Sequence, residues 1–146
     1  MRLRLSRDSG SPEATFAIAR ELAKRHPDCP AYYLEGDLGA GKTLFTKGLA
    51  TFYGIRADVV VSPTFSLVNR YSGLARDMYH IDLYRIEDER ELDELGIEEM
   101  EDEGALLVVE WAEKLGRYRR QDATVVRFEV SGESQRRLHI VEHDRT

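Results

Sequence analysis

The sequence has almost none of the residues that build a disulfide framework or a cysteine-based metal site. Cys29 is the only cysteine among the 146 residues, so no intrachain disulfide can form and a zinc site built on cysteines is excluded. No apolar run is long enough for a signal peptide or a membrane span. We therefore expect a cytoplasmic protein that does not contact a membrane.

Internal repeats and linkers rich in Gly/Ser or Pro are also missing. With 42% hydrophobic residues, the chain has enough apolar material for one core of ordinary size, and it has too few residues for a second domain. We therefore expect residues 1–146 to form a single domain.

Basic residues are outnumbered by acidic ones. The chain has 21 lysines and arginines against 27 aspartates and glutamates, which gives a formal net charge of -6. The acidic excess is concentrated between Glu87 and Glu103, where it would repel a phosphate backbone. Direct nucleic-acid binding by this stretch is disfavoured. We interpret it as a solvated face, with a basic protein partner as the alternative.

Helix signals recur along the chain. Ser11 and Pro12 predict a helix start, because serine caps free N–H groups and proline suits the first helical position. Pro27 disfavours helical geometry in the residue before it, so this helix should end there. Asp88 with Glu91 resembles a capping box and predicts another helix start.

Seven segments predict strands, because they are short and rich in β-branched, aromatic or other apolar residues. Residues 105–109 form a continuous apolar run, which is typical of a central strand buried on both faces of a parallel sheet. Strands interleaved with helices indicate an α/β fold, a three-layer sandwich whose mixed sheet has a parallel centre and antiparallel additions. The expected strands are residues 31–35, 59–61, 65–71, 76–85, 105–109, 124–130 and 137–141.

Residues 36–43 read GDLGAGKT and fit the pattern G-x-x-x-x-G-K-[ST], between the strand at 31–35 and a helix expected at 43–52. Glycines let the backbone turn several N–H groups toward one point, and the N-terminus of the following helix favours anions. The pattern predicts a phosphate-binding loop for Mg-ATP, in which Lys42 reaches the β and γ phosphates and the Thr43 hydroxyl ligates magnesium. An ordinary glycine-rich turn is the alternative.

Magnesium in such a site normally needs an acid at the end of a buried strand. Glu110 directly follows the apolar run and is our candidate; alternatively it only caps a helix that begins at Trp111. Asp82 competes, because a period of two places His80, Asp82 and Tyr84 on one face of a strand. Asp82 could hold the metal through water or orient the attacking water. A hydrogen-bonded pair with His80 on a half-exposed strand is equally consistent with the pattern.

Three further residues near these motifs have two interpretations. Ser62 and Thr64 offer hydroxyls on either side of Pro63 that could sense the γ phosphate, although this chemistry by itself favours a plain turn. Trp111 is more typical of a core than of a nucleotide contact. Its position beside Glu110 keeps a role in shaping the site open.

Five segments, in this order, resemble the bacterial TsaE-type ATPases of tRNA threonylcarbamoyladenosine (t6A) biosynthesis. They are GDLGAGKT at 36–43, SPTF at 62–65, HIDLYR at 80–85, the segment 91–96 that begins Glu-Leu and ends in glycine, and VEW at 109–111. The H-x-D-x-Y-R and V-E-W segments are far more specific than the phosphate loop alone. Together the five span most of the chain, and they imply a P-loop NTPase-like fold.

The resemblance also implies an Mg-dependent ATPase with weak or partner-dependent hydrolysis, required for t6A formation at position 37 of tRNAs. Its partners would be the two sugar-kinase-like subunits that transfer the threonylcarbamoyl group, and tRNA would be met through that complex. Carried over, Thr43 and Glu110 become the magnesium ligands and Lys42 the phosphate clamp.

Other roles carried over from the resemblance extend the predicted site. Thr64, Asp82 and Trp111 become residues needed for hydrolysis or coupling. Contacts to ATP or ADP are implied for Gly36, Asp37, Leu38, Gly39, Ala40, Gly41, Lys42, Thr43 and Leu44, together with Thr15 and Arg137.

Two other classes of protein also carry a phosphate loop. A small-molecule kinase normally has an Arg-rich lid, and only Arg117, Arg119 and Arg120 form a comparable cluster. A regulatory GTPase normally carries N-K-x-D, and Asn69-Arg70 is not followed by the aspartate. Dependence on an acceptor and competition between ATP and GTP would separate these classes from an ATPase.

Overall fold

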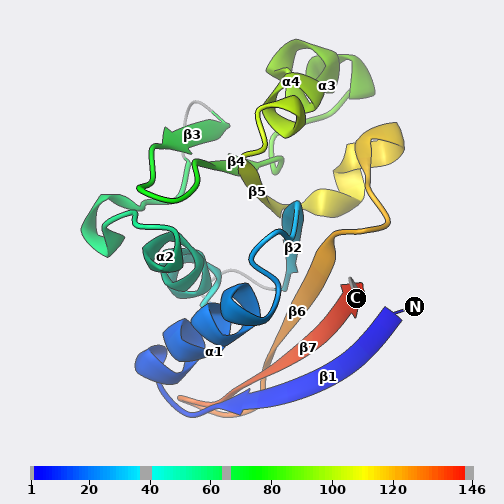
Figure 1. Ribbon diagram of the computed structural model, residues 1–146. Coiled ribbons are helices and arrows are strands. Elements are labelled where there is room, and N and C mark those ends of the chain that lie inside the picture. The colour runs from blue at the N-terminus through cyan, green and yellow to red at the C-terminus, as the bar shows by residue number, and fades with distance from the viewer. Residues whose placement is uncertain (1, 37–40, 64–66, 144–146) are drawn as a thin grey trace.

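The computed structural model describes residues 2–36, 41–63 and 67–143, in which strands and helices alternate (Figure 1). No helix in these ranges is long and apolar enough to cross a membrane. The strands are β1 (Arg2–Ser9), β2 (Ala31–Glu35), β3 (Val68–Tyr71), β4 (Met78–Asp82), β5 (Leu106–Glu110), β6 (Thr124–Val130) and β7 (Arg136–His143). The helices are α1 (Pro12–Arg25), α2 (Lys42–Phe52), α3 (Glu89–Leu95), α4 (Ile97–Asp102) and the 3-10 helices η1 (Ala57–Val59) and η2 (Ala112–Tyr118).

In the described part of the chain, seven strands form one mixed sheet in the order β1-β7-β6-β2-β5-β4-β3. The neighbours β6, β2, β5 and β4 run parallel, whereas β3 on one side and β7 and β1 on the other are antiparallel additions. The predicted parallel centre with antiparallel additions is therefore confirmed. The carboxyl ends of the four parallel strands meet at one edge, which is where ligands bind in open α/β sheets.

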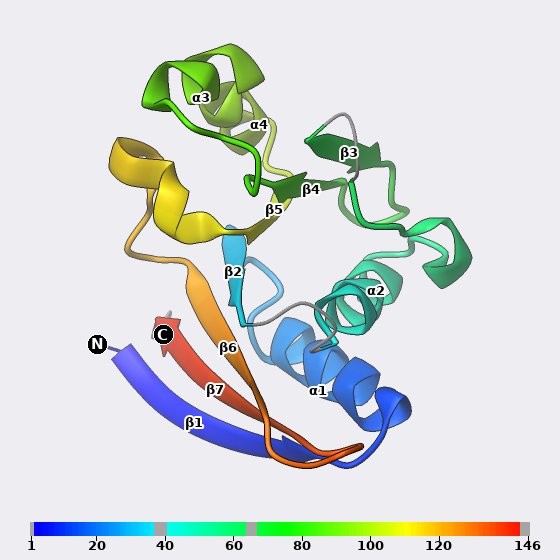
Figure 2. The same ribbon diagram turned by 180° about the vertical axis from the view of Figure 1, so that it is seen from behind.

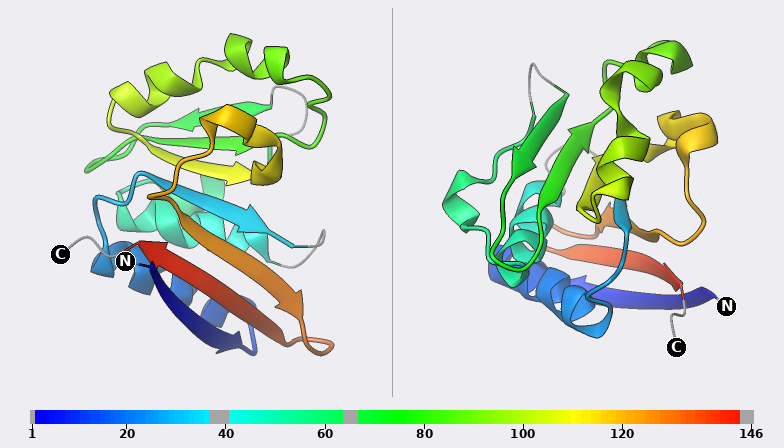
Figure 3. Two further views of the ribbon diagram at one scale, coloured as in Figure 1. Left: turned by 90° about the vertical axis from the view of Figure 1, so that its right-hand side faces the viewer. Right: turned by 45° about the horizontal axis from the view of Figure 1, so that its top comes forward.

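Helices cover the two faces of the sheet unequally. α1 and α2 lie side by side on one face and share a core cluster with β2, β5, β6 and β7 (Figures 1 and 2). α3, α4 and η2 pack over β2, β4 and β5 on the opposite face, which completes the predicted three layers. On that second face, no helix among the described residues lies over β6, β7 and β1 (Figure 3, left).

Three helix ends follow their local sequence. The Ser11 hydroxyl accepts a hydrogen bond from the Ala14 N–H at 3.1 Å, where α1 begins. Asp88 and Glu91 form the predicted capping box at the start of α3. Gly96 ends α3 in the left-handed conformation, with φ of 77°. The Ser11 cap and the Asp88–Glu91 box were predicted from short-range chemistry.

α1 and α2 approach each other most closely at Gly48. A Cβ at this position would lie 2.5 Å from the Phe16 carbonyl oxygen and 2.8 Å from the Ala19 Cβ. These contacts are too short for any side chain, so only glycine lets the two helices pack at this distance. Glycine inside a helix costs about 1 kcal/mol relative to alanine, and the close helix contact offsets that cost.

The strand predicted at residues 59–61 is wrong. η1 ends at Val59, and the Val61 backbone bonds to side chains instead of to a neighbouring strand. Its N–H donates to the Tyr71 hydroxyl at 3.1 Å, and its carbonyl accepts from the Asn69 amide at 3.1 Å. The segment is β-branched, but β propensity alone does not form a strand where the backbone groups bond to side chains.

Three strands, β4, β3 and β1, differ in length or existence from the prediction. β4 ends at Asp82 instead of residue 85, because the Tyr84 N–H donates to the Asp82 carboxylate at 3.0 Å and the chain turns out of the sheet. β3 begins at Val68, and residues 65 and 66 of its predicted range lie outside the described residues. β1 was not predicted; among the described residues it is an edge strand that pairs only with β7, at the far end of the chain.

Candidate functional site

Two glycines frame the turn between β2 and α2. Gly36 has φ of 130° and Gly41 has φ of 99°, both in the region that strains any residue with a Cβ. A Cβ on Gly36 would also lie 2.7 Å from the Phe128 carbonyl oxygen. The predicted loop residues Asp37, Leu38, Gly39 and Ala40 lie outside the described residues.

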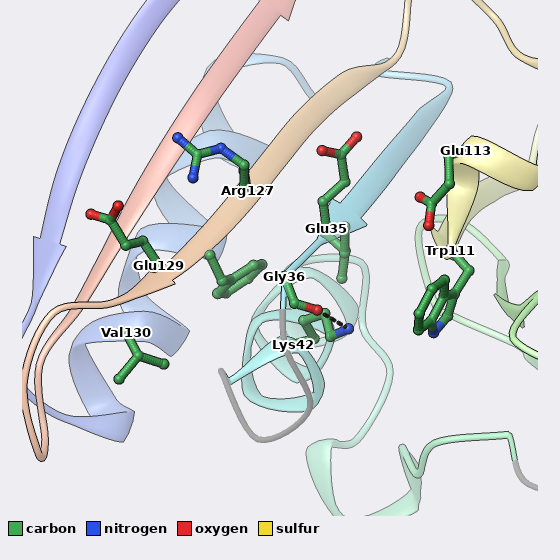
Figure 4. A pocket seen from close by; sticks show the side chains of 10 residues that line it. Glu35, Gly36, Lys42, Trp111, Glu113, Arg127, Glu129 and Val130 are labelled. Carbon is green, nitrogen blue, oxygen red and sulfur yellow. Dashed lines mark hydrogen bonds between the residues drawn. The ribbon is translucent and has the colours of Figure 1, made fainter.

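Lys42 is the first residue of α2 and is 8% exposed. Its Nζ donates to the Gly36 carbonyl at 2.9 Å and lies 3.6 Å from Glu110 Oε1. Figure 4 shows the side chain turned back toward Gly36. A lysine is rarely buried without a partner, so these two contacts hold the ammonium group beside the N-terminus of α2.

Glu110 ends β5 and is 7% exposed. Its Oε2 lies 2.7 Å from His80 Nε2, and its other oxygen faces Lys42. Burial acts to raise the pKa of Glu110, but the hydrogen bond from His80 and the electrostatic influence of His80 and Lys42 outweigh it, so the pKa is lowered. The carboxylate is therefore ionised at neutral pH, as a magnesium ligand must be.

His80 is completely buried in β4. The strand register places His80 opposite Val108 and Asp82 opposite Glu110, so both side chains of β4 share a face with Glu110. The predicted polar pair of His80 with Asp82 on a half-exposed strand is thus replaced by a buried pair with Glu110. Within the described ranges, His80 Nδ1 has no hydrogen-bond partner.

Asp82 lies at the end of β4, half-buried beside Glu110 in the strand register. Burial is the largest influence on the pKa of Asp82 and raises it; the hydrogen bond from the Tyr84 N–H opposes this, and the charge of Glu110 adds to the rise. The site therefore contains two neighbouring carboxylates with opposite pKa shifts.

Thr43 follows Lys42 in the first turn of α2. Its Oγ1 lies 2.9 Å from the Ser62 hydroxyl, so the Ser62-Pro63 segment contacts the start of the helix. Thr64 lies outside the described residues. The structure thus places Ser62, the first hydroxyl of the predicted segment, at the predicted phosphate site.

On the other side of Gly41, a hollow of about 180 Å³ lies between α1, α2 and the β6–β7 turn. Thr15 is buried there, with its hydroxyl 2.7 Å from the Ser9 hydroxyl. Arg137 does not reach this hollow, because its Nε donates to Asp8 at 2.9 Å on the opposite face of the sheet. The hollow is lined by Ser11, Pro12, Thr15, Gly41, Leu44, Glu133, Ser134 and Arg136.

Trp111 is 38% exposed and does not belong to the core. It has φ of 59° and ψ of 41°, a left-handed conformation that costs a residue with a side chain about 1–2 kcal/mol. Its ring centroid lies 5.2 Å from that of the exposed Tyr84, and Lys114 Nζ lies 5.6 Å from the Trp111 ring centre. No sequence pattern predicted this backbone conformation.

Trp111 borders a cavity of about 620 Å³ at the carboxyl edge of the sheet (Figure 4). The described residues contain no cluster of three or more His, Cys, Asp or Glu side chains able to hold a metal. A magnesium ion would therefore depend on Thr43, Glu110 and the phosphate oxygens of its nucleotide, which is how Mg²⁺ is commonly held. The cavity is lined by Leu34, Glu35, Gly36, Lys42, Trp111, Glu113, Arg127, Phe128, Glu129 and Val130.

Known proteins resemble the chain in sequence over most of its length. The tRNA threonylcarbamoyladenosine biosynthesis protein TsaE of Bacillus subtilis (strain 168) is 38% identical over 128 residues, which cover 88% of this chain and 79% of the relative. The protein of the same name from Haemophilus influenzae is 43% identical over 98 residues, 66% of this chain and 61% of the relative. The chain thus spans less than two thirds of the length of the second relative.

The fold and the family comparison agree with these relatives. The crystal structure of Bacillus subtilis YdiB superposes with a TM-score of 0.75 at 29% identity, covering 97% of this chain and 87% of that one. Residues 9–138 match the family described as threonylcarbamoyl adenosine biosynthesis protein TsaE. The chain therefore belongs to the TsaE family of tRNA threonylcarbamoyladenosine biosynthesis proteins.

Proposed function

We propose that this chain is the Mg-dependent ATPase of the machinery that forms t6A at position 37 of tRNAs, and that residues 1–146 are a single P-loop ATPase domain. The observation that carries the proposal is the buried Lys42 at the start of α2, held 3.6 Å from the anionic Glu110. A helix N-terminus, a lysine and a carboxylate at the end of the neighbouring strand are the parts that a bound Mg-nucleotide requires.

In this arrangement the phosphates bind at the N-terminus of α2, and Lys42 contacts the β and γ phosphates. Thr43 and Glu110 would hold the magnesium ion, which would neutralise charge on the phosphate oxygens. Asp82, whose pKa is raised, orients the attacking water or accepts its proton. Lys42 keeps its hydrogen bond to Gly36 only until a phosphate replaces that acceptor.

The positions of the carboxylates support one direction for the nucleotide. Glu110 and Asp82 lie on the β4–β5 side of Lys42, so the γ phosphate would point there. The nucleoside end then lies in the hollow with Thr15 and Leu44. We assign Arg136, instead of Arg137, as the basic side chain at that end, because Arg136 lines the hollow.

The partners proposed for this ATPase are the two sugar-kinase-like subunits of the t6A machinery. Trp111 and Tyr84 form an exposed aromatic pair beside Glu110, where a partner could sense the state of the site. We assign Trp111, with Thr64, to coupling between hydrolysis and assembly.

ATP hydrolysis measured with the isolated chain, and then with both partner subunits with and without tRNA, tests this function. We expect slow phosphate release from the chain alone and faster release in the complex. Release that requires a small-molecule acceptor would instead indicate a kinase, and displacement of ATP by equimolar GTP would indicate a GTPase.

A further inference from the structure

The strands β1, β7 and β6 present a face that no helix in the described part of the chain covers (Figure 3, left). Alternate residues of a strand point to opposite faces, and Leu5, Leu138 and Ile140 pack in the core beneath α1. Their neighbours along each strand therefore point to the open side. These outward residues are Arg2, Arg4, Ser6, Asp8, Val125, Arg127, Glu129, Arg137, His139, Val141 and His143.

A basic side chain lies near each of Asp8, Glu129 and Glu35. Asp8 accepts a hydrogen bond from Arg137 at 2.9 Å, and Glu129 Oε1 lies 3.5 Å from His139 Nε2, a contact that is an ion pair only when the imidazole is protonated. At the end of β2, Glu35 Oε1 lies 3.8 Å from the Arg119 guanidinium.

Three arginines remain in excess once those pairs are formed. Arg2, Arg4 and Arg127 are exposed, and their guanidinium groups make no ion pair or hydrogen bond with the rest of the described chain. This local excess of positive charge contrasts with the protein as a whole, which carries a formal net charge of -6. The open face of this acidic protein thus carries three unpaired guanidinium groups.

Arg4 and Arg127 also line a hollow of about 430 Å³ on this face, together with Ser6 and His139. The hollow shares Glu35 and Arg127 with the cavity beside Lys42, so the two depressions adjoin. The acidic helices α3 and α4 lie at the opposite end of the sheet (Figure 1). An anion approaching the open face therefore avoids the repulsive stretch between residues 87 and 103.

We propose that the open face of β1, β7 and β6 binds the phosphate backbone of RNA, and specifically the tRNA on which the family acts. Arginine is the preferred side chain for phosphate, and Ser and His add further donors. A protein partner is the rival occupant, but the core of a protein interface is rich in large apolar and aromatic residues. Among the outward residues, only Val125 and Val141 are apolar and none is Phe, Tyr or Trp.

Fluorescence anisotropy of labelled tRNA, titrated with the isolated chain at low salt and without nucleotide, tests the proposal. We expect a dissociation constant in the micromolar range, with a salt dependence typical of a few phosphate contacts. The double variant Arg4→Glu, Arg127→Glu should bind at least about 10-fold more weakly and should reduce the salt slope by about 2.

The double variant Arg56→Glu, Arg90→Glu is the matched control. It changes the net charge equally, on exposed residues outside the open face. It should bind tRNA within about 2-fold of the unmodified chain, and both double variants should keep their thermal unfolding midpoints. The Lys42→Ala variant should also bind tRNA normally, which separates this proposal from that of the ATPase.

Equal weakening in the two double variants would overturn the proposal, because only net charge would then matter. Unchanged tRNA binding by Arg4→Glu, Arg127→Glu would overturn it as well. If that variant instead failed to co-elute with the partner subunits, the open face would be a protein interface.

Discussion

At the scale of single residues, Glu110 and Asp82 show how one edge of a sheet can give two carboxylates different chemistry. Burial acts to raise the pKa of both groups. His80 and Lys42 contact Glu110 directly and lower its pKa overall, whereas Asp82 has no cation within bonding distance in the described structure and its pKa stays raised. Environments that push two pKa values apart suit one group to metal binding and the other to proton handling.

Removing the charge of Glu110 and removing the charge of Asp82 should change the stability of the nucleotide-free protein in opposite directions. A lowered folded-state pKa means that Glu110 stabilises the fold above the ordinary glutamate range, and that this contribution is lost as the pH falls through the lowered pKa. A raised pKa means that ionised Asp82 destabilises the fold once the pH exceeds that pKa.

Glu110→Gln should therefore lower the thermal unfolding midpoint at pH about 7, and Asp82→Asn should raise it; both effects should shrink at pH about 4. Thermal denaturation at the two pH values checks this. Asparagine keeps the acceptor for the Tyr84 N–H, so its effect reports charge. Shifts of the same sign for both variants at neutral pH would contradict the assignment.

His80 should act as a positioning residue for the Glu110 carboxylate. His80→Ala removes the 2.7 Å contact, so we expect half-maximal hydrolysis to need about 10-fold more Mg²⁺. ATP binding without magnesium should change little. His80→Gln can still donate to the carboxylate and should restore part of the magnesium affinity, whereas His139→Ala, away from the site, should have no effect. An unchanged magnesium titration for His80→Ala would show that the contact is only structural.

At the scale of helices and strands, the predictable features are those with a local cause. Ser11, the Asp88–Glu91 box and the apolar run of β5 each act within a few residues, and each was confirmed. β1 could not be predicted from its alternating Leu and Arg residues, because its only partner lies more than a hundred residues away.

In the candidate site, too, residues in local motifs could be predicted and contacts between distant segments could not. Lys42, Thr43 and Glu110 are prominent because they belong to motifs with local spacing. The His80–Glu110 contact joins two strands across 30 residues of sequence, and it depends on the register between β4 and β5. No pattern within either strand specifies that register.

The close contact between α1 and α2 at Gly48 can be tested by substitution. Gly48→Ala should destabilise the protein by about 1–3 kcal/mol, because the added Cβ would meet the Phe16 carbonyl at 2.5 Å and push α2 from α1. Urea denaturation measures this, with Lys47→Ala on the same helix as the control, expected within about 0.5 kcal/mol. Stabilisation of Gly48→Ala would mean that helix propensity outweighs the packing.

At the scale of the whole molecule, the sheet separates three surfaces. Its carboxyl edge carries the proposed ATP site, α3 and α4 carry exposed acidic side chains, and the open face of β1, β7 and β6 carries unpaired arginines. The acidic stretch between Glu87 and Glu103 is mostly exposed, as expected of a solvated face. This separation would let one small chain contact a nucleotide and an RNA on different sides, away from the acidic face.

The most direct measurement is calorimetric titration of Mg-ATP into the unmodified chain and into Lys42→Ala. The account predicts saturable binding to the first and binding about 10- to 100-fold weaker to the second, because the charged hydrogen bonds from Lys42 to phosphate are lost. Equal affinity in the two proteins would contradict a phosphate site at the start of α2.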